Sequence, residues 1–265
     1  MKTVAPVSEI YQAVADALRA CQRPLFITGA GMSADSGLPT YRGLGGLYNH
    51  NDTDEGYAIE DALSGRMLRE KPEVCWKYLW QIASSCRGKK CNRGHKVLAS
   101  IEDVKPETWV LTQNIDGFHS LAGSQNIIEI HGKASQLICL ECGARASAEE
   151  WIDGYSGEPK DLPPKCPKCN GVVRPEVVLF GESLPDEAIE KLNYLVYHDQ
   201  RDLIFSIGTT GVFPYIAQPI LMAQAAGIPT VEINPCETEL SSIVEYRIAE
   251  KAANALEKIW NLCNY

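Results

Sequence analysis

The sequence predicts an α/β fold, in which a Rossmann-like, doubly wound parallel sheet carries a smaller domain with a zinc ribbon and a helical module. Short apolar runs alternate with amphipathic helical stretches along most of the chain, which is the pattern of βαβ units. Two stretches, 46–94 and 135–172, break that alternation, and the second carries two Cys-x-x-Cys pairs. We therefore assign these two stretches to the smaller domain, and 1–45, 95–134 and 173–265 to a discontinuous Rossmann-like domain.

The expected elements begin with a helix over 8–21, which Ser8 caps and in which Ile10 and Val14 recur at helical spacing. The run PLFITGAG at 24–31 then predicts a buried strand that ends in a glycine turn. Ligands of such sheets bind at the carboxyl ends of the strands, so the side chains that follow those ends are candidates for function. Further strands are expected at 108–112, 127–130, 177–180, 202–208 and 229–234, and helices at 94–104, 185–199 and 213–227.

Composition and charge narrow the classes of function. The chain of 265 residues is 45% hydrophobic and 22% charged, as expected of a globular protein. No apolar run approaches the roughly 20 residues of a membrane span, and the start MKTVAPVSEIYQ lacks the apolar core of a signal peptide. We therefore expect a soluble, cytoplasmic protein without a membrane partner. The net charge of −9 disfavours direct binding to nucleic acid and favours a basic protein tail as partner.

Four cysteines form the strongest single motif. Cys139 and Cys142 make one Cys-x-x-Cys pair, in the context CLECG, and Cys166 and Cys169 make the other, in CPKCN. This spacing is typical of one structural, tetrahedral zinc, because four thiolates leave no open position for catalysis. The small or turn-forming residue after each second cysteine would let backbone amides point at the thiolates. Two disulfides or redox pairs are the alternative interpretation.

The glycines after the first strand predict a turn that approaches a phosphate. Gly29, Ala30 and Gly31 follow the strand directly, and the run GAGMSADSGLPTYRG adds the aromatic face of Tyr41 and the positive fork of Arg42. The dinucleotide fingerprint G-x-G-x-x-G of ordinary dehydrogenases is incomplete here. The glycines alone would also suit a plain strand-to-helix turn.

Two more strand ends carry polar side chains. Gln113, Asn114 and Asp116 follow the strand TWVLT, where amides and a carboxylate suit sugar hydroxyls and a carboxamide, although turn chemistry would explain them too. His131 ends the strand IIEI, where its imidazole could accept a hydroxyl proton near neutral pH or serve as a hydrogen-bonded structural residue. The structural interpretation is our default for the other histidines, His50, His95, His119 and His198.

Together these motifs resemble the sirtuin family. GAGMSADSGLPTYR matches the family signature GAG-x-S-x-x-SG-[IL]-P-x-[FY]-R, TQNID is identical to the family's motif, and HG follows at the expected distance. The likeness continues through both cysteine pairs, RPEVVLFGE, GTT and VEIN, and spans residues 22 to about 255. Tyr41 stands where phenylalanine is commoner and Thr210 where serine is, and neither change removes a required chemical group.

The resemblance implies a lysine deacylase that consumes NAD. The carbonyl oxygen of an acylated lysine would attack the anomeric carbon of the nicotinamide ribose, nicotinamide would leave, and water would release lysine and O-acyl-ADP-ribose. His131 would be the base on a ribose hydroxyl, while Asn114 and Asp116 hold the carboxamide and Gln113 the ribose. The expected partner is an acylated lysine in a protein or peptide.

Matching the remaining motifs assigns the other site residues. Phe180, Gly181 and Glu182 are expected to pair edge to edge with an extended peptide, and Val178 to contact the acyl-lysine. Two alternatives stay open, a sirtuin-type mono-ADP-ribosyltransferase and a noncatalytic NAD-sensing or zinc-ribbon interaction module. The expected cofactor-binding residues are Gly29, Ala30, Gly31, Ser33, Tyr41, Arg42, Gln113, Asn114, Ile115, Asp116, Gly208, Thr209, Thr210 and Asn234.

The sequence also bears on the acyl group. Sirtuins that prefer succinyl or malonyl lysine carry a Tyr-x-x-Arg pair in the helical segment, whereas here Tyr78 is followed three residues later by Gln81. A distal carboxylate would then lack its bidentate partner. Trp76, Leu79 and Trp80 indicate an apolar wall, so we expect acetyl or other uncharged acyl groups. The cations that could substitute from another direction are Arg87, Lys89 and Lys90.

Overall fold

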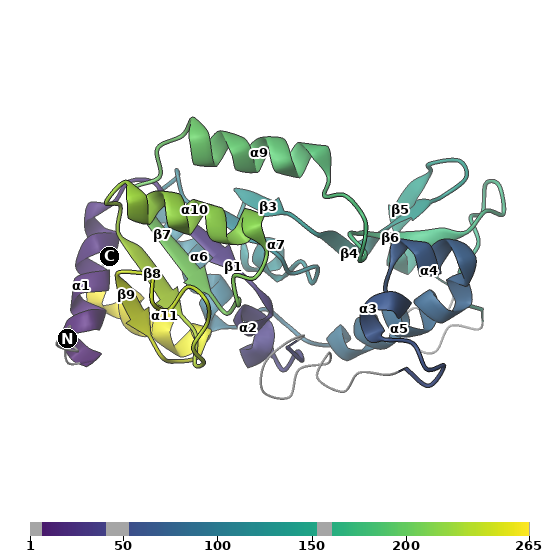
Figure 1. Ribbon diagram of the computed structural model, residues 1–265, viewed down its shortest axis with the longest axis horizontal. Helices are drawn as coiled ribbons and strands as arrows, with labels where there is room; N and C mark the ends of the chain where they lie inside the picture. Colours follow the sequence, from purple (N-terminus) through teal and green to yellow (C-terminus); the bar gives the residue numbers. More distant parts are fainter. Residues whose placement is uncertain (1–6, 41–52, 153–160, 265) are drawn as a thin grey trace.

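The computed structural model describes residues 7–40, 53–152 and 161–264, which form two sheets at opposite ends of an elongated molecule (Figure 1). Six strands form the larger sheet in the order β3-β2-β1-β7-β8-β9, and every neighbouring pair is parallel. The smaller sheet, β5-β4-β6, is antiparallel. The predicted α/β fold, a parallel sheet with a second, smaller module, is confirmed.

The parallel sheet changes direction at its centre. The chain runs outward from β1 through β2 to β3, and it returns to the other side of β1 with β7 before continuing to β8 and β9. The carboxyl ends of β1 and β7 therefore flank the topological switch point, where ligands of open α/β sheets bind. The strands are β1 (Pro24–Thr28), β2 (Trp109–Thr112), β3 (Ile127–Glu129), β7 (Leu203–Ile207), β8 (Thr230–Ile233) and β9 (Tyr246–Ile248).

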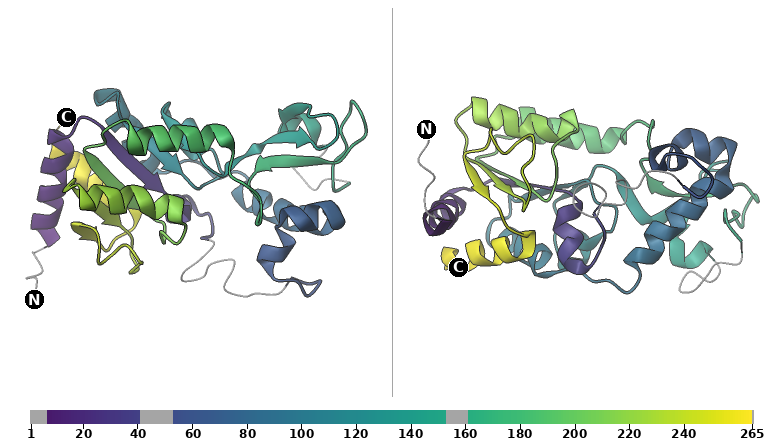
Figure 2. Two further views of the ribbon diagram at one scale, coloured as in Figure 1. Left: turned by 45° about the horizontal axis from the view of Figure 1, so that its top comes forward. Right: turned by 60° about the horizontal axis from the view of Figure 1, so that its bottom comes forward.

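Helices cover both faces of this sheet, as Figure 2 shows. Phe26 of β1 packs with the helices of one face, while its neighbours Leu25 and Ile27 pack with those of the other. This alternation makes every residue of β1 buried, which explains why the strand reads as a continuous apolar run. One face carries α1 (Val7–Ala20), α6 (Arg93–Val104) and α11 (Ala252–Cys263), and the other carries α9 (Asp186–Tyr197) and α10 (Pro214–Ala225).

The second module has a core of its own. Trp76 is buried there, and its indole Nε1 donates a hydrogen bond to the Val173 carbonyl at 2.8 Å, which joins the helical segment to the small sheet. Its helices are α3 (Ile59–Ala62), α4 (Gly65–Glu70), α5 (Pro72–Cys86) and α8 (Ala148–Trp151), and its strands are β4 (Gly132–Cys139), β5 (Arg145–Ser147) and β6 (Val173–Val177).

The strand predicted at 177–180 is wrong. The strand in this region is β6, which ends at Val177 and pairs antiparallel with β4. Residues 173, 175 and 177 face the core of the small module, whereas 178–180 leave that sheet and line a cleft. An apolar run does not reveal which of two sheets it joins. The small sheet also crosses the domain boundaries predicted at 134/135 and 172/173, because both β4 and β6 belong to it.

Several shorter elements complete the description. The helix α2 (Ala30–Ser33) and a 3₁₀ turn (Ala34–Ser36) follow β1, and α7 (Phe118–Ala122) follows β2. The strand β9 and the helix α11 were not among the expected elements. Within the described part of the chain, no helix is both long enough and apolar enough to cross a membrane.

Candidate active site at the carboxyl ends of the parallel strands

A cleft of about 640 Å³ opens between the carboxyl ends of the parallel strands and the second module. It contains most of the residues predicted from sequence motifs, although they are far apart in the chain. Tyr41, Arg42 and His50 lie outside the described residues. The predicted residues that line the cleft are Gly29, Ala30, Gly31, Gln113, Asn114, Ile115, His131, Val178, Phe180, Gly181, Glu182, Gly208, Thr209, Thr210 and Asn234.

Gly29, Gly31 and Gly208 bring two strand-end turns into direct contact. The Gly31 amide donates a hydrogen bond to the Gly208 carbonyl at 2.9 Å, and the Gly29 amide donates to Ile207 at 3.0 Å. A Cβ on Gly31 would lie only 2.6 Å from the Gly208 Cα. The sequence offered two interpretations of Gly29 and Gly31, a turn that approaches a phosphate and a plain strand-to-helix turn, and the structure requires both glycines for contact between the turns.

Replacing Gly208 with alanine should therefore push the two turns apart. Gly208 has φ +59, and its added Cβ would lie 2.5 Å from the Gly31 carbonyl carbon. Gly227 has φ +70 but nothing within 4 Å, so Gly227→Ala measures the backbone strain alone. We expect Gly208→Ala to lower the free energy of unfolding by about 1–3 kcal/mol more than Gly227→Ala. Equal losses in denaturant titrations of the two variants would contradict this reading.

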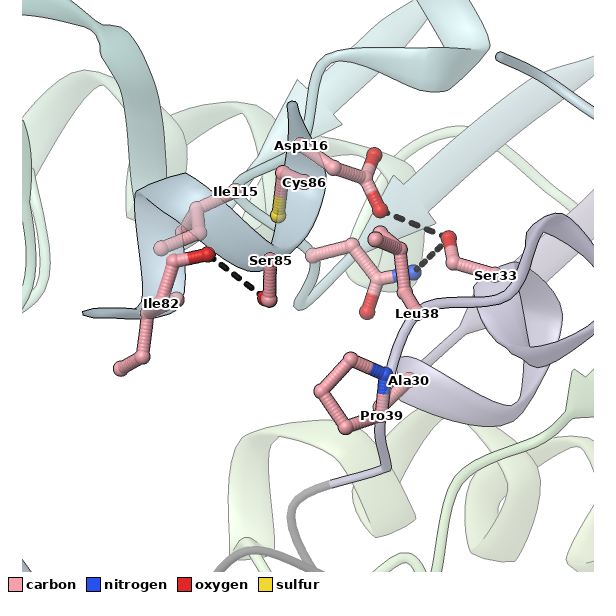
Figure 3. Close-up of a pocket in the computed structure, with 10 residues that line it drawn as sticks. Ala30, Ser33, Leu38, Pro39, Ile82, Ser85, Cys86, Ile115 and Asp116 are labelled. Carbon is pink, nitrogen blue, oxygen red and sulfur yellow. Dashed lines mark hydrogen bonds between the residues drawn. The ribbon is translucent and has the colours of Figure 1, made fainter. Parts of the chain in front are cut away.

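Ser33, Asn114 and Asp116 form a hydrogen-bonded group at a smaller cavity of about 30 Å³ beside the cleft (Figure 3). The Ser33 hydroxyl donates to Asp116 Oδ2 at 2.6 Å and accepts from Asn114 Nδ2 at 3.2 Å. Burial raises the pKa of Asp116, while the hydrogen bonds from Ser33 and the Phe118 amide oppose that shift. The group thus presents amide and carboxyl functions in fixed positions, as recognition of a carboxamide requires.

His131 has a defined tautomer. Its Nδ1 lies 2.9 Å from the Gln113 carbonyl oxygen, which can only accept, so Nδ1 carries the proton. The free lone pair is therefore on Nε2, which lies 2.7 Å from the Tyr215 hydroxyl. Burial lowers the pKa of His131, against the opposing effect of the Gln113 carbonyl, and the ring is neutral near neutral pH. A neutral imidazole with Nε2 at a cleft is suited to general-base chemistry.

His95 and His119 are buried behind this site. His95 completes the capping box of helix α6, whose N-cap is Asn92: its Nδ1 accepts from the Asn92 amide at 3.3 Å, and burial lowers its pKa to about 4. His119 Nε2 lies 2.9 Å from the Thr28 hydroxyl, and burial also lowers its pKa. Neither ring lines the cleft. The structural role that we expected for both histidines stays a prediction.

The Glu182 carboxylate is already hydrogen-bonded to other groups of this chain. It accepts from Arg174 Nη2 at 2.8 Å and from the Leu179 amide at 2.9 Å. The Phe180 backbone is also paired, because its amide donates to Leu63 and its carbonyl accepts from Gly65, both at 3.0 Å. The expected pairing of this segment with a peptide stays a prediction. Because the Phe180 amide and carbonyl are already bonded, it applies to the backbone around Gly181, which the ion pair between Arg174 and Glu182 holds in place.

Helix α5 contributes Leu79 and Ile82 to the cleft, which differs from the wall that we expected. Trp76 is in the core of the small module, and Trp80 does not line the cleft. Tyr78 is turned away too, since its hydroxyl donates to Glu55 Oε2 at 2.5 Å. The wall is apolar and contains Leu79 as predicted, but Ile82 stands in it where Trp76 and Trp80 were expected, because the helix face that meets the cleft depends on how α5 packs.

Sequence reasoning missed other residues that line the cleft. Phe213 and Tyr215 follow β7 at the start of α10, so the rule that ligands collect at strand ends could have found them. Glu237 closely follows Asn234 in the sequence, and Lys251 lies farther along the chain. Leu63 comes from the helical module, where no local sequence signal marks it. These five residues all line the cleft.

The four predicted zinc ligands converge. The sulfur atoms of Cys139, Cys142, Cys166 and Cys169 all lie within 4.8 Å of one another, with Cys139–Cys169 at 3.4 Å and Cys142–Cys166 at 3.7 Å. Tetrahedral zinc with Zn–S bonds of about 2.3 Å requires S–S distances of about 3.8 Å, so the four residues fit the metal. The residues after the second cysteines, Gly143 and Asn170, have φ +68 and +63, as the turn interpretation requires. The Lys168 amide also points at the Cys166 sulfur, 3.4 Å away.

A cleft at the switch point of a doubly wound parallel sheet, together with a four-cysteine module, defines a Rossmann-type α/β protein. The chain belongs to the Sir2 family, whose sequence model matches residues 29–214. The resemblance to the sirtuins is thereby confirmed.

Individual relatives agree with the family assignment over nearly the whole chain. NAD-dependent protein deacylase 2 of Pseudomonas aeruginosa is 49% identical over 249 residues, which cover 93% of this chain and 94% of the relative. The crystal structure of a Sir2 homolog–NAD complex is similar with a TM-score of 0.81 and 30% identity, covering 96% of this chain and 93% of that one. A Sir2 complex with deacetylated p53 peptide and 3′-O-acetyl ADP-ribose has a TM-score of 0.84 and 26% identity, covering 94% and 97%.

Proposed function

We propose that this chain is an NAD-dependent protein deacylase that removes acetyl or other uncharged acyl groups from lysines, releasing nicotinamide and O-acyl-ADP-ribose. The observation that carries the assignment is the neutral His131 imidazole, with its Nε2 lone pair at the cleft where the strand-end motifs meet. Relatives named NAD-dependent protein deacylase or deacetylase support it. NAD supplies the ADP-ribosyl group that receives the acyl group.

His131 would take a proton from a ribose hydroxyl at Nε2. The Gln113 carbonyl accepts from Nδ1 and would stabilise the positive charge that develops on the ring. The Gln113 side chain is itself held by the Thr209 hydroxyl at 2.8 Å, so the strand end and the adjacent turn form one rigid unit. This unit can orient a ribose in the cleft, which lowers the entropic part of the barrier.

The cleft would hold the two ends of NAD by different groups. Asn114 and Asp116, with Ser33, would hold the carboxamide in the smaller cavity. At the other end, Asn234 Nδ2 donates to the Thr209 carbonyl at 3.1 Å, and Asn234 lines the cleft, where it would meet an adenosine ribose. The turn around Gly208, Thr209 and Thr210 lies between these ends and would meet the phosphates.

One structural zinc per chain would complete the second module. The four thiols meet at the spacing that zinc requires, and two of them, Cys139 and Cys166, belong to the buried core of the module. Zinc would hold together β4 and the turn that leads into β6. It would thereby support the segment from Val178 to Glu182 without taking part in the chemistry.

One assay separates this function from its alternatives. The protein is incubated with NAD and an acetylated peptide, and nicotinamide and peptide masses are followed. Loss of the acetyl mass together with nicotinamide release supports deacylation. A gain of ADP-ribose on the protein substrate would support the mono-ADP-ribosyltransferase. If no nicotinamide is released, the result would support the noncatalytic interaction module.

We expect kcat/KM to be higher for acetyl-lysine than for succinyl-lysine in the same peptide. Leu79 and Ile82 offer no donor to a distal carboxylate, and Lys251, the single cation among the described residues that line the cleft, lies beside Asp35. A carboxylate buried there would lose hydration without gaining a partner. Kinetics with acetyl, butyryl and succinyl peptides measure this preference, and a succinyl value above the acetyl value would refute it.

A matched pair of variants tests the physical reason. Ile82→Arg places a guanidinium on the cleft face of α5, and we expect it to raise the succinyl-to-acetyl ratio of kcat/KM about tenfold. Gln12→Arg adds the same charge at an exposed position of α1 that does not line the cleft, and it should leave the ratio unchanged. Equal effects of both variants would show that the charge acts at long range.

A further inference from the structure

The hydroxyl of Tyr215 is hydrogen-bonded to the reactive nitrogen of His131. The Tyr215 hydroxyl lies 2.7 Å from Nε2. Because Nδ1 donates to the Gln113 carbonyl, Nε2 carries the lone pair and the hydroxyl must be the donor. Burial raises the pKa of Tyr215 to about 12, so the hydroxyl keeps its proton near neutral pH. The short distance is that of a well-formed hydrogen bond.

The aromatic surroundings hold Tyr215 in this position. Its ring stacks on Phe213, with centroids 5.5 Å apart and an angle of 13° between the planes. His131 meets both rings edge-on, each at a centroid distance of 6.0 Å. Phe213 and Tyr215 begin helix α10, and all three residues line the cleft. The tyrosine is therefore part of the cleft wall and is within reach of any ligand that approaches His131.

The hydrogen bond has a consequence for ligand binding. The Nε2 atom of a neutral imidazole has one lone pair, so it accepts one strong hydrogen bond at a time. A ribose hydroxyl that gives its proton to Nε2 must donate to that same lone pair. The ribose hydroxyl and the Tyr215 hydroxyl therefore compete, and one bond must break when the other forms.

We propose that Tyr215 is a positioning residue that caps the base in the ligand-free enzyme and yields Nε2 to the ribose hydroxyl when NAD binds. This inference rests on the proposed role of His131. The cap holds the imidazole in its reactive tautomer and orientation and keeps water off the lone pair. Its cost is a hydrogen bond that must be given up before the base can act.

Tyr215→Phe tests the competition, because it removes the hydroxyl and keeps the ring that stacks on Phe213. We expect the variant to bind ADP-ribose about two- to tenfold more tightly in calorimetry, since one net hydrogen bond no longer has to be broken. Tyr194→Phe is the control, because Tyr194 is exposed on α9 and does not line the cleft. Its affinity should equal that of the unmodified protein. Unchanged or weaker binding by Tyr215→Phe overturns the proposal.

Two further measurements identify the mechanism. In a His131→Ala background, which has no lone pair to compete for, Tyr215→Phe should give no gain in affinity, and a gain there would overturn the proposal. In ligand-free protein at a pH well above the His131 pKa, the ¹⁵N resonance of Nε2 should move on Tyr215→Phe while Nδ1 stays protonated. An unmoved resonance would show that the hydroxyl is not bonded to Nε2 in solution. The base role itself is judged separately, by the turnover of His131→Ala.

Discussion

His131→Ala is expected to lower kcat/KM for deacylation by at least about 100-fold while leaving NAD affinity nearly unchanged, because a general base acts in the chemical step. The structure gives the reason at atomic detail. Nε2 is the acceptor at the cleft, and alanine removes that acceptor. Single-turnover kinetics with an acetylated peptide measure the chemical step, and calorimetry with NAD measures the affinity.

His198→Ala is the matched control, because His198 is exposed beyond the end of α9 and does not line the cleft. It should turn over at the rate of the unmodified protein. The pH profile adds an independent check. Burial lowers the pKa of His131, so the acid limb of kcat/KM should lie below the ordinary histidine value of about 6.5. Full turnover by His131→Ala would remove this residue from the mechanism.

Removing zinc is expected to unfold the second module. Structural zinc contributes about 10 kcal/mol or more to small domains that depend on it, which exceeds the stability that the core of this module can supply alone. The expected sequence of events under a strong chelator is loss of one equivalent of zinc, protease sensitivity within 132–177, and loss of activity. Metal analysis, limited proteolysis and the deacylation assay follow the three steps.

Cys142→Ser and Cys236→Ser form a matched pair for this prediction. Both cysteines are exposed free thiols, but only Cys142 belongs to the four-cysteine cluster. The first variant should lose zinc and become sensitive to protease, and the second should keep both zinc and its resistance. Less than about half an equivalent of zinc in freshly purified, active protein would contradict a structural role.

The sequence by itself determined the elements of the parallel sheet and the chemistry at the ends of its strands. The apolar runs at 24–31 and 202–208 predicted strands β1 and β7, because buried parallel strands are apolar on both faces. The two Cys-x-x-Cys pairs predicted the four-cysteine cluster, because the spacing of zinc ligands is a local property of the sequence. Strand-end residues such as His131 were also identifiable, since parallel strands place their carboxyl ends at one edge.

Only the tertiary structure decided how distant segments meet. It assigned β6 to the small sheet, paired the Glu182 carboxylate with Arg174, and turned Ile82 rather than Trp76 toward the cleft. It also placed the Tyr215 hydroxyl on His131 Nε2, across 84 residues of chain. Each of these contacts depends on which faces of two remote elements pack together. That choice is made by the packing of the whole fold, so no local pattern of residues records it.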